Sequence, residues 1–336
     1  MITEAINNVV EGNDLSTGDA ESAMTQIMEG KATDAQIGSF LTALRLKGET
    51  IDEISAFASI MRDKASAIKP KVEPLLDTCG TGGDKSSTFN ISTTVAFVLA
   101  AGGVGVAKHG NRSVSSCCGS ADVLEALGVK IDQTPEQVEK CIEDIGIGFM
   151  FAPGFHKAMK YAIGPRKEIA IRTVFNILGP LTNPAGAGYQ LLGVYDPKLC
   201  TSLSRVLKKL GSKAAMVVHG EGLDEVATTG RTMISELKAD GTVEDYEITP
   251  EGFGFKTSSL DELTSESVEE NSRITKDILS GSEGPKTDIV ILNSACALKV
   301  SQKVSSIEEG VEMARDIINS GKALEKLDEL VKHSNA

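Results

Sequence analysis

The chain has 336 residues, of which 41% are hydrophobic and 24% are charged, so it is long enough to bury a substantial core. Its 47 acidic and 34 basic residues give a formal net charge of -13, which disfavours nonspecific binding to nucleic acid. The N-terminus has no basic segment followed by an apolar run, and no stretch approaches the roughly 20 apolar residues of a membrane span. We therefore expect no signal peptide, no membrane contact and no nucleic-acid partner.

The cysteines indicate a reducing compartment. There are six in the chain, which is no disulfide framework at this length. Cys117 and Cys118 are adjacent, and no pair has the C-x-x-C spacing that is typical of zinc or redox sites. Free thiols persist in the cytoplasm, so the composition predicts a cytoplasmic protein.

The first part of the chain is predicted to be helical. Thr33 and Thr50 each begin a capping box, in which a Thr side chain and a Gln or Glu three positions later bond to each other's backbone N–H. Apolar residues at helical spacing follow both boxes, and Gly30 and Gly48 are placed to end helices. These patterns predict a small helical domain over residues 1–70.

After residue 70 the pattern alternates between short apolar runs and helical stretches. The runs that we expect to form strands cover residues 74–76, 104–107, 129–131, 147–151, 189–195, 214–218 and 289–292. The stretches expected to be helical cover residues 91–101, 121–127, the segment after Thr134, 305–318 and 322–333. This alternation predicts a large α/β domain over residues 71–336, with a mostly parallel central sheet flanked by helices.

Two segments depart from the alternation. Residues 232–237 and 242–248 flank Asp240-Gly241, a turn pair that is typical of a β-hairpin. Residues 155–175 read as helical again, and we expect them to join the small helical domain.

A glycine-rich segment follows the first predicted strand. It reads D-T-C-G-T-G-G-D over residues 77–84 and continues as T-F-N-I-S-T over residues 88–93 into a helix. Glycines let backbone N–H groups approach a ligand closely, and a helix N-terminus rich in Asn, Ser and Thr presents N–H groups and hydroxyls to an anion. The spacing fits neither a Walker loop nor a dinucleotide fingerprint. The pattern predicts a phosphate-binding loop, with a tight turn and an ordinary helix cap as the alternative.

A second polar loop follows the strand predicted over residues 104–107. It begins K-H-G-N-R at Lys108 and leads into the next helix, with Ser120 as the expected N-cap. Lys108 and Arg112 would bring positive charge to the C-terminal end of a strand, where open α/β sheets bind ligands, although solvated basic residues look the same in sequence. For His109 we favour a positioning hydrogen bond over a role as general base.

Two more segments carry candidate chemistry. H-G-E-G-L-D-E follows the strand predicted over residues 214–218 and ends in Asp224 and Glu225. Adjacent carboxylates beside phosphates suit Mg²⁺, which prefers oxygen ligands, although such pairs also occur on solvated surfaces. Arg166 lies in G-P-R-K-E and can pair bidentately with a carboxylate. The run R-T-V-F-N-I-L-G-P-L-T-N-P follows, and its Gly- and Pro-rich part over residues 179–184 is expected to be a rigid loop that walls a pocket or merely turns a corner.

Together these motifs resemble those of the anthranilate phosphoribosyltransferases. They stand in the family's order and cover nearly the whole chain, and the set is far more specific than any one motif. The resemblance implies Mg²⁺-dependent transfer of the phosphoribosyl group from phosphoribosyl diphosphate (PRPP) to the amine of anthranilate, with release of diphosphate, in tryptophan biosynthesis. It also implies a homodimer joined through the small domains.

The resemblance further implies which residues form the site. PRPP would be held by Gly80, Gly83, Asp84, Thr88, Asn90, Ile91, Ser92, Thr93, Lys108, Gly110, Asn111, Ser115, Ser116 and Ser120. Mg²⁺ would be held by Ser92, Asp224 and Glu225. Anthranilate would contact Gly80, Asn111 and Arg166, with Arg166 pairing with its carboxylate. The catalytic residues would be Lys108, Asp224 and Glu225.

Small departures from the family's pattern concern loop flexibility and access of the aromatic substrate. Lys85 stands where many relatives have glycine, and Phe155 and Lys157 flank His156 where His and Pro are common.

Two other functions compete with the transferase. A pyrimidine-nucleoside phosphorylase shares the fold and the K-H-G-N-R motif but needs no Asp-Glu pair. A non-catalytic nucleic-acid-binding relative would need a basic groove, against which the net charge of -13 argues.

Overall fold

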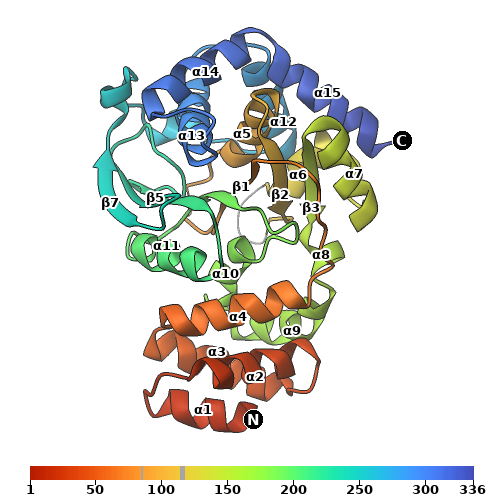
Figure 1. Ribbon diagram of the computed structural model, residues 1–336, viewed down its shortest axis with the longest axis vertical. Coiled ribbons are helices and arrows are strands. Elements are labelled where there is room, and N and C mark those ends of the chain that lie inside the picture. Colours follow the sequence, from red (N-terminus) through yellow and green to blue (C-terminus); the bar gives the residue numbers. More distant parts are fainter. Residues whose placement is uncertain (85, 114–117) are drawn as a thin grey trace.

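The computed structural model describes residues 1–84, 86–113 and 118–336. The chain opens with four helices, α1 (Ile2–Val10), α2 (Thr17–Met28), α3 (Asp34–Lys47) and α4 (Ile51–Asp63). They form a bundle at one end of the molecule (Figure 1). Their buried side chains belong to one hydrophobic cluster that continues into one face of the sheet above them. The bundle is therefore anchored to the rest of the chain through a shared core.

The predicted capping boxes begin two of these helices. The hydroxyls of Thr33 and Thr50 accept the backbone N–H three residues on, at 3.3 and 3.2 Å. The Glu53 side chain of the second box is fully buried. It accepts from the backbone N–H of Leu15 at 2.9 Å and from Lys47 Nζ at 2.9 Å, so one carboxylate ties together α3, α4 and the loop before α2.

The remaining chain builds a seven-stranded sheet. Its strands are β1 (Leu75–Gly80), β2 (Gly105–Gly110), β3 (Ile147–Phe151), β4 (Tyr189–Gly193), β5 (Ala214–Gly220), β6 (Thr232–Leu237) and β7 (Val243–Ile248). Their order is β3-β2-β1-β4-β5-β6-β7. The first five are parallel, whereas β6 and β7 add an antiparallel hairpin at one edge, as predicted. The predicted fold class is confirmed.

Helices cover the sheet. They are α5 (Ile91–Ala101), α6 (Ser120–Ala126), α7 (Pro135–Ile145), α11 (Leu199–Lys209), α12 (Val268–Leu279), α13 (Pro285–Val300), α14 (Ile307–Asn319) and α15 (Lys322–Ser334). The central helix α5 is buried almost throughout and lies between the sheet and the C-terminal helices. None of the helices in the described part of the chain is long and apolar enough to cross a membrane.

The segment between β3 and β4 returns to the helical bundle. It contains the short helices α8 (Ala152–Phe155) and α10 (Phe175–Leu178) on either side of α9 (Lys160–Ile169). Helix α9 contacts α2 and α3, and a side chain at Gly30 would run into the ring of Tyr161. The chain thus crosses from the sheet to the bundle and back, which brings α9 opposite the loops of the sheet (Figure 1).

Two predicted strands are wrong. Residues 289–292 lie within α13, a fully packed helix of 16 residues that begins at Pro285. A continuous apolar run suits a buried helix as well as a buried strand, and here the length of the element decides. Residues 129–131 form no strand because their backbone bonds elsewhere. The N–H of Val129 donates to Leu124 O at 2.9 Å, and that of Lys130 donates to Ser334 Oγ at 3.0 Å.

Candidate active site

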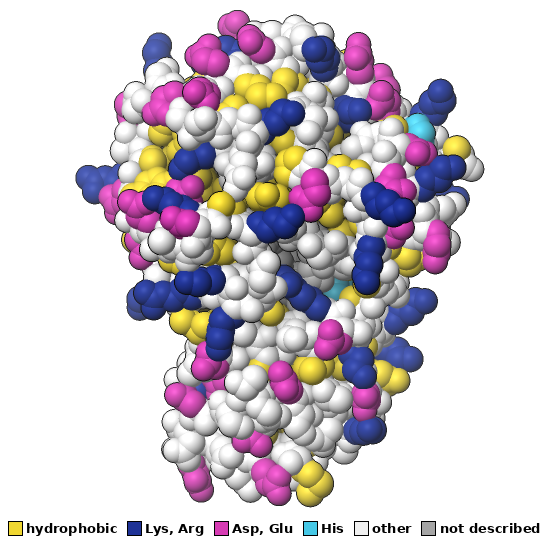
Figure 2. Space-filling view, in the orientation of Figure 1, with side chains coloured by type: hydrophobic (Ala, Val, Ile, Leu, Met, Phe, Trp, Pro, Cys, Tyr) yellow, Lys and Arg dark blue, Asp and Glu magenta, His cyan; other side chains and the backbone are white. Residues whose placement is uncertain are grey.

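The strand order reverses beside β1. From β1 the chain moves to β2 and β3 on one side, and then returns to β4 and β5 on the other. The carboxyl ends of these parallel strands share one edge, and open α/β sheets bind ligands at such a reversal. The three predicted loops follow β1, β2 and β5, so all of them reach this edge. Lys and Arg side chains gather at the waist between the sheet and the helical bundle (Figure 2).

Two glycines let the loop after β5 reach the loop after β1. A side chain at Gly193, where β4 ends, would overlap the backbone carbonyl of Asp224. A side chain at Gly80, where β1 ends, would overlap the Asp224 carboxylate. In return, Asp224 Oδ2 accepts from the backbone N–H of Gly82 at 2.7 Å. The glycines at these strand ends therefore serve close approach of the two loops.

The carboxylates of Asp84, Asp224 and Glu225 influence one another at this crossing. The backbone N–H of Asp224 donates to Asp84 Oδ2 at 3.4 Å. Burial raises the pKa of the Asp224 carboxyl well above its ordinary range, and the charges of Asp84 and Glu225 raise it further. Burial also raises the pKa of Glu225 to about 8, against the opposing influence of Lys108. A divalent ion bound here would offset the repulsion between these buried carboxylates.

The donor set fits Mg²⁺. Among the described residues, no three His, Cys, Asp or Glu side chains form a ready-made metal cage. Mg²⁺ does not need one, because it keeps several waters and usually takes one or two carboxylates together with phosphate oxygens. Asp224 and Glu225 supply such carboxylates, and the hydroxyl of Ser92 lies beside Lys108 at 3.3 Å.

Lys108 is buried beneath the start of α5. Its ammonium donates to Thr78 O at 2.6 Å and to Ser92 Oγ at 3.3 Å, and the residue is only 3% exposed. Burial lowers the pKa of Lys108, whereas the neighbouring acidic groups Asp77 and Glu225 oppose that shift. The backbone N–H of Ser92 in turn bonds to the Glu225 carboxylate. The predicted catalytic residues Lys108 and Glu225 therefore lie at the N-terminus of α5, and Asp224 lies next to them at the glycine loop.

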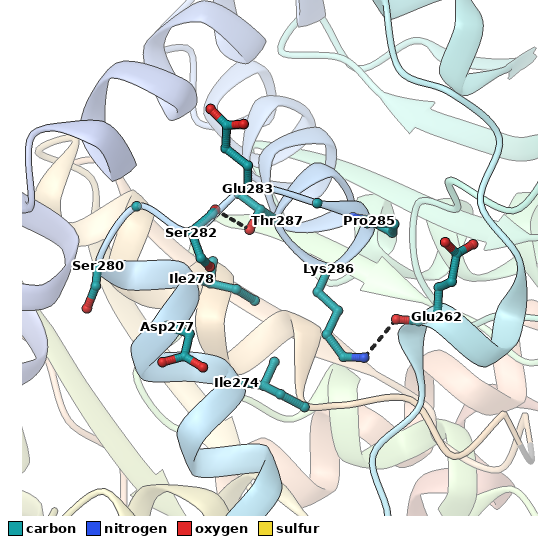
Figure 3. A pocket seen from close by; sticks show the side chains of 12 residues that line it. Glu262, Ile274, Asp277, Ile278, Ser280, Ser282, Glu283, Pro285, Lys286 and Thr287 are labelled. Carbon is teal, nitrogen blue, oxygen red and sulfur yellow. Dashed lines mark hydrogen bonds between the residues drawn. The ribbon is translucent and has the colours of Figure 1, made fainter.

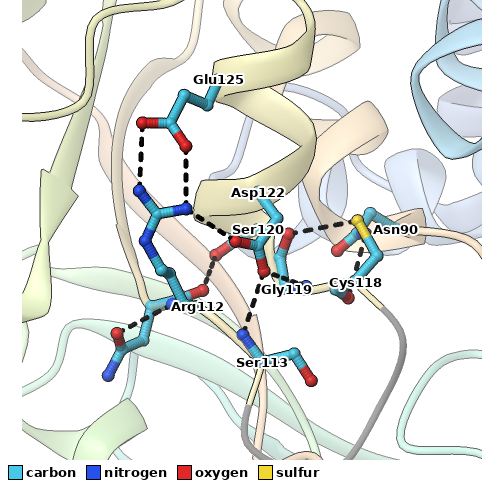
Figure 4. Close-up of polar contacts among 9 residues, drawn as sticks. Asn90, Arg112, Ser113, Cys118, Gly119, Ser120, Asp122 and Glu125 are labelled. Carbon is cyan, nitrogen blue, oxygen red and sulfur yellow. Dashed lines mark hydrogen bonds and ion pairs between the residues drawn. The ribbon is translucent and has the colours of Figure 1, made fainter. Parts of the chain in front are cut away.

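The loop after β2 carries less free positive charge than predicted. Arg112 Nη1 lies 2.8 Å from both Asp122 Oδ1 and Glu125 Oε2, so its charge is neutralised within α6 (Figure 4). The predicted N-cap is also wrong by one residue. Helix α6 begins at Ser120 with Gly119 as N-cap, because Asp122 Oδ2 accepts the Gly119 N–H at 2.9 Å. Of the predicted PRPP residues, Ser115 and Ser116 lie outside the described part of the chain.

Asn111 links this loop to α6. Its carbonyl accepts from Ser120 Oγ at 3.3 Å and from the Ala121 N–H at 3.2 Å. A side chain at Gly110 would overlap Ser120 Oγ, so the end of β2 and the first residue of α6 are in close contact. Gly110, Asn111 and Ser120, three of the predicted ligand-binding residues, are thus brought together.

His109 lies in a pair of buried imidazoles. Its ring centroid is 5.0 Å from that of His156. Burial, with a smaller contribution from His156, lowers the pKa of His109 to about 3, and burial lowers the pKa of His156 to about 4. The backbone of Gly179 lies close to the His109 ring and partly opposes this shift. So weak a base does not suit general-base catalysis at neutral pH, which agrees with the positioning role favoured from the sequence.

Arg166 stands apart from the other predicted site residues. It lies on α9, half-buried, with its guanidinium 5.1 Å from the centroid of the Phe175 ring. Within the described residues no hydrogen bond or ion pair joins it to Gly80 or Asn111, the other predicted anthranilate contacts. The structure thus places Arg166 on the bundle side of the site and the glycine loop on the sheet side.

Two supporting residues have roles that were not predicted. Arg172 donates to the backbone oxygen of Gly83, and its guanidinium stacks 4.2 Å from the centroid of the Tyr195 ring. Asn293, fully buried on α13, accepts the Val226 N–H at 2.9 Å and donates to Val226 O at 2.7 Å, just beyond Glu225. The sequence does mark Asn293, because it is a polar residue within an otherwise apolar run.

A cavity of about 680 Å³ lies elsewhere, between the end of α12 and the start of α13 (Figure 3). Lys286 spans part of it and donates to Glu262 O at 2.7 Å. Its lining includes none of the predicted site residues. The cavity is therefore separate from the candidate site.

Comparison with known proteins agrees with this geometry. The "Glycosyl transferase family, a/b domain" matches residues 72–324, and the "Glycosyl transferase family, helical bundle domain" matches residues 3–65. The chain is 58% identical to the anthranilate phosphoribosyltransferase of Acetivibrio thermocellus, across 100% of this chain and 97% of that protein. The chain belongs to the anthranilate phosphoribosyltransferase family. Membership confirms the predicted family and enzyme class, and it supports the transferase over the phosphorylase and the nucleic-acid-binding relative.

Solved structures of anthranilate phosphoribosyltransferases share the whole fold. The enzyme of Thermus thermophilus superposes with a TM-score of 0.94 at 41% identity, over 99% of both chains. The enzyme of Saccharomyces cerevisiae in complex with PRPP and Mg gives a TM-score of 0.91 at 29% identity, over 99% of this chain and 98% of that one. A further yeast structure, in complex with 4-fluoroanthranilate, gives 0.89 at 28% identity, over 99% and 97% of the two chains.

We expect Gly193→Ala to lower the free energy of unfolding by about 2 kcal/mol, because the added Cβ overlaps a backbone carbonyl that cannot rotate away. Urea denaturation measures the change. Gly18→Ala is the control, since a Cβ at Gly18 in α2 meets no atom within 4 Å, and it should be neutral or stabilising. Equal stabilities of the two variants would contradict the close approach of Asp224.

We expect the imidazole NMR signals of His109 and His156 to show no titration between about pH 5 and 8. Both pKa values lie below the ordinary 6.5, so the folded protein binds fewer protons than the unfolded chain in the interval between them. These histidines thus stabilise the fold above about pH 6.5, and that contribution is lost as the pH falls. A titration midpoint near 6.5 for either ring would refute their burial as neutral groups.

Proposed function

We propose that this site transfers the phosphoribosyl group of PRPP to the amine of anthranilate, with Mg²⁺, in tryptophan biosynthesis. One observation carries the proposal: a glycine loop, a helix N-terminus, a buried lysine and an Asp-Glu pair converge at one edge of the sheet. Anions are held by such backbone N–H groups, and divalent cations by such carboxylates. The yeast complexes with PRPP and Mg, and with 4-fluoroanthranilate, support the choice of substrates.

The phosphate groups of PRPP would lie on the glycine loop, the first turn of α5 and the loop after β2. The residues that we assign to PRPP binding are Gly80, Gly83, Asp84, Thr88, Asn90, Ile91, Ser92, Thr93, Lys108, Gly110, Asn111, Ser115, Ser116 and Ser120. The contact between Gly110 and Ser120 and the ammonium of Lys108 beside Ser92 support grouping these loops into one site.

Ser92, Asp224 and Glu225 would hold Mg²⁺, which supplies positive charge beside the diphosphate when bound. The position of both carboxyls supports this assignment, because burial and neighbouring carboxylates raise their pKa values and a cation between them would offset that cost. Binding of the ion would release protons from the pair.

Charge builds on the diphosphate as it leaves C1 of the ribose through an oxocarbenium-like transition state. Lys108 is fixed by Thr78 O and Ser92 Oγ, so its ammonium needs no reorganisation to stabilise that charge. The amine of anthranilate is neutral at pH 7 and needs no strong base, in keeping with the lowered pKa of His109. Catalysis would then come from positioning the amine and stabilising the leaving group.

Anthranilate would lie between the bundle and the sheet, in contact with Gly80, Asn111 and Arg166. The Arg166 guanidinium comes from α9, on the opposite side from the glycine loop, and is suited to pair bidentately with the carboxylate of the substrate. This arrangement supports a division into a small domain of residues 1–70 joined by residues 155–175, and a large domain of residues 71–336.

We also infer a cytoplasmic homodimer joined through the small domains. The bundle leaves apolar side chains exposed, with Val10, Leu46 and Ile163 at 69%, 83% and 45%. Such a surface on helices α1, α3 and α9 suits a second copy of the same bundle.

The direct test mixes the purified protein with anthranilate, PRPP and Mg²⁺ and follows the fluorescence of anthranilate. Loss of fluorescence that requires all three components is the expected result. If there is no loss, and thymidine or uridine is cleaved by phosphate instead, the protein is a nucleoside phosphorylase and the proposal fails.

Arg166→Ala should raise the KM for anthranilate about tenfold or more, because hydrogen bonds to a charged group are lost, and should leave the KM for PRPP within about twofold. Steady-state kinetics with each substrate varied in turn measures both constants. Lys167→Ala, at the exposed next position, is the matched control and should change neither. Equal increases in the two KM values would refute the assigned role of Arg166.

A further inference from the structure

The end of the glycine loop rests on a segment that none of the sequence motifs includes. The Ser265 N–H donates to Ser87 O at 3.1 Å, and the Phe89 N–H donates to Leu263 O at 3.1 Å. Between them, Thr88 pairs with Thr264 in an antiparallel bridge. The backbone just before α5 is therefore held by residues that precede α12.

Asn271 continues this contact from α12 itself. It is fully buried, and its Oδ1 accepts from the backbone N–H of Asn90 at 2.8 Å and from Asn90 Nδ2 at 3.3 Å. A backbone N–H requires an oxygen acceptor, so the orientation of the Asn271 amide is fixed. One buried side chain thus holds both the main chain and the side chain of Asn90.

This contact leaves the start of α5 free of a side-chain cap. Asn90 occupies the N-cap position of α5 but makes no capping hydrogen bond, unlike Thr33 and Thr50 at their helices. Its amide instead turns toward Asn271 and the carbonyl of Cys118, which lies next to it in Figure 4. The N-terminal turn of this 11-residue helix is therefore not closed by the side chain of its own N-cap residue.

We propose that Asn271 is a positioning residue for PRPP. This role rests on the proposed function, since it acts through Asn90 and the first turn of α5 on the site assigned to the phosphates. Asn271 fixes the position and direction of that turn without touching the ligand. Anthranilate is assigned to groups other than Asn90 and this turn. Removal of the Asn271 side chain should therefore weaken the binding of PRPP and leave the binding of anthranilate unchanged.

The same helix provides a matched control one turn later. Thr275 Oγ1 lies 3.2 Å from Thr94 Oγ1, and both residues are fully buried. This hydrogen bond also joins α12 to α5, and Thr94 bonds only to the carbonyl of Asn90, not to the N–H or amide that Asn271 holds. Thr275→Val therefore removes a buried hydrogen bond between the same two helices and leaves the contact with Asn90 intact.

The experiment compares the wild-type protein with Asn271→Ala and Thr275→Val. Calorimetry with Mg²⁺ measures the Kd for PRPP, kinetics measures both KM values, and urea unfolding measures stability. We expect Asn271→Ala to raise the Kd and KM for PRPP about tenfold and to leave the KM for anthranilate within about twofold. Thr275→Val should lower the free energy of unfolding but change neither the Kd for PRPP nor the KM for either substrate. Asn271→Leu, which keeps most of the volume but offers no acceptor, replaces the alanine variant if that one does not fold.

An unchanged Kd for PRPP in Asn271→Ala or Asn271→Leu would overturn the role of Asn271 alone. So would an equal loss of PRPP affinity in Thr275→Val, because the effect would then follow general loosening between α12 and α5. A wild-type protein that binds no PRPP would overturn the proposed function and this role with it.

Discussion

The site depends on one close approach, that of the Asp224 loop to the ends of β1 and β4. Gly80 and Gly193 make the approach possible, since any side chain there would occupy the space of Asp224. It brings a carboxylate pair from the far side of the reversal in strand order to the glycine loop and the start of α5. Each strand end alone is an ordinary turn. Because the parallel strands share an edge, the turns together form a site with both cation-binding and anion-binding groups.

The site must attract anions although the molecule as a whole is negatively charged. A chain of net charge -13 repels a polyphosphate at long range, so local groups must supply the attraction. Arg112 does not, because Asp122 and Glu125 already neutralise it. Lys108 and the first turn of α5, which has no side-chain cap, must supply the attraction, and a divalent cation at Asp224 and Glu225 would complete it. Burial raises the pKa of both carboxyls, and a bound cation would favour their charged forms.

The sequence predicted the fold class and the loops well, because local patterns determine them. Capping boxes at Thr33 and Thr50 begin helices, and glycine-rich segments mark the ends of strands. Predictions from the sequence were wrong where contacts between distant parts of the chain determine the structure. The apolar run over residues 289–292 is a buried helix, and the charge of Arg112 is neutralised by α6. The contact of Asn271 with Asn90 joins residues 181 positions apart, so no local pattern reveals it.

The central claim is that Asp224 and Glu225 make turnover depend on Mg²⁺. The most direct measurement is the rate of phosphoribosyl transfer over a range of Mg²⁺ concentrations, in the wild-type protein and in a variant with both Asp224→Ala and Glu225→Ala. We predict that the double variant loses Mg²⁺-dependent turnover while remaining folded, because it removes the carboxylates but no part of the core. Unchanged dependence on Mg²⁺ in the double variant would contradict the account.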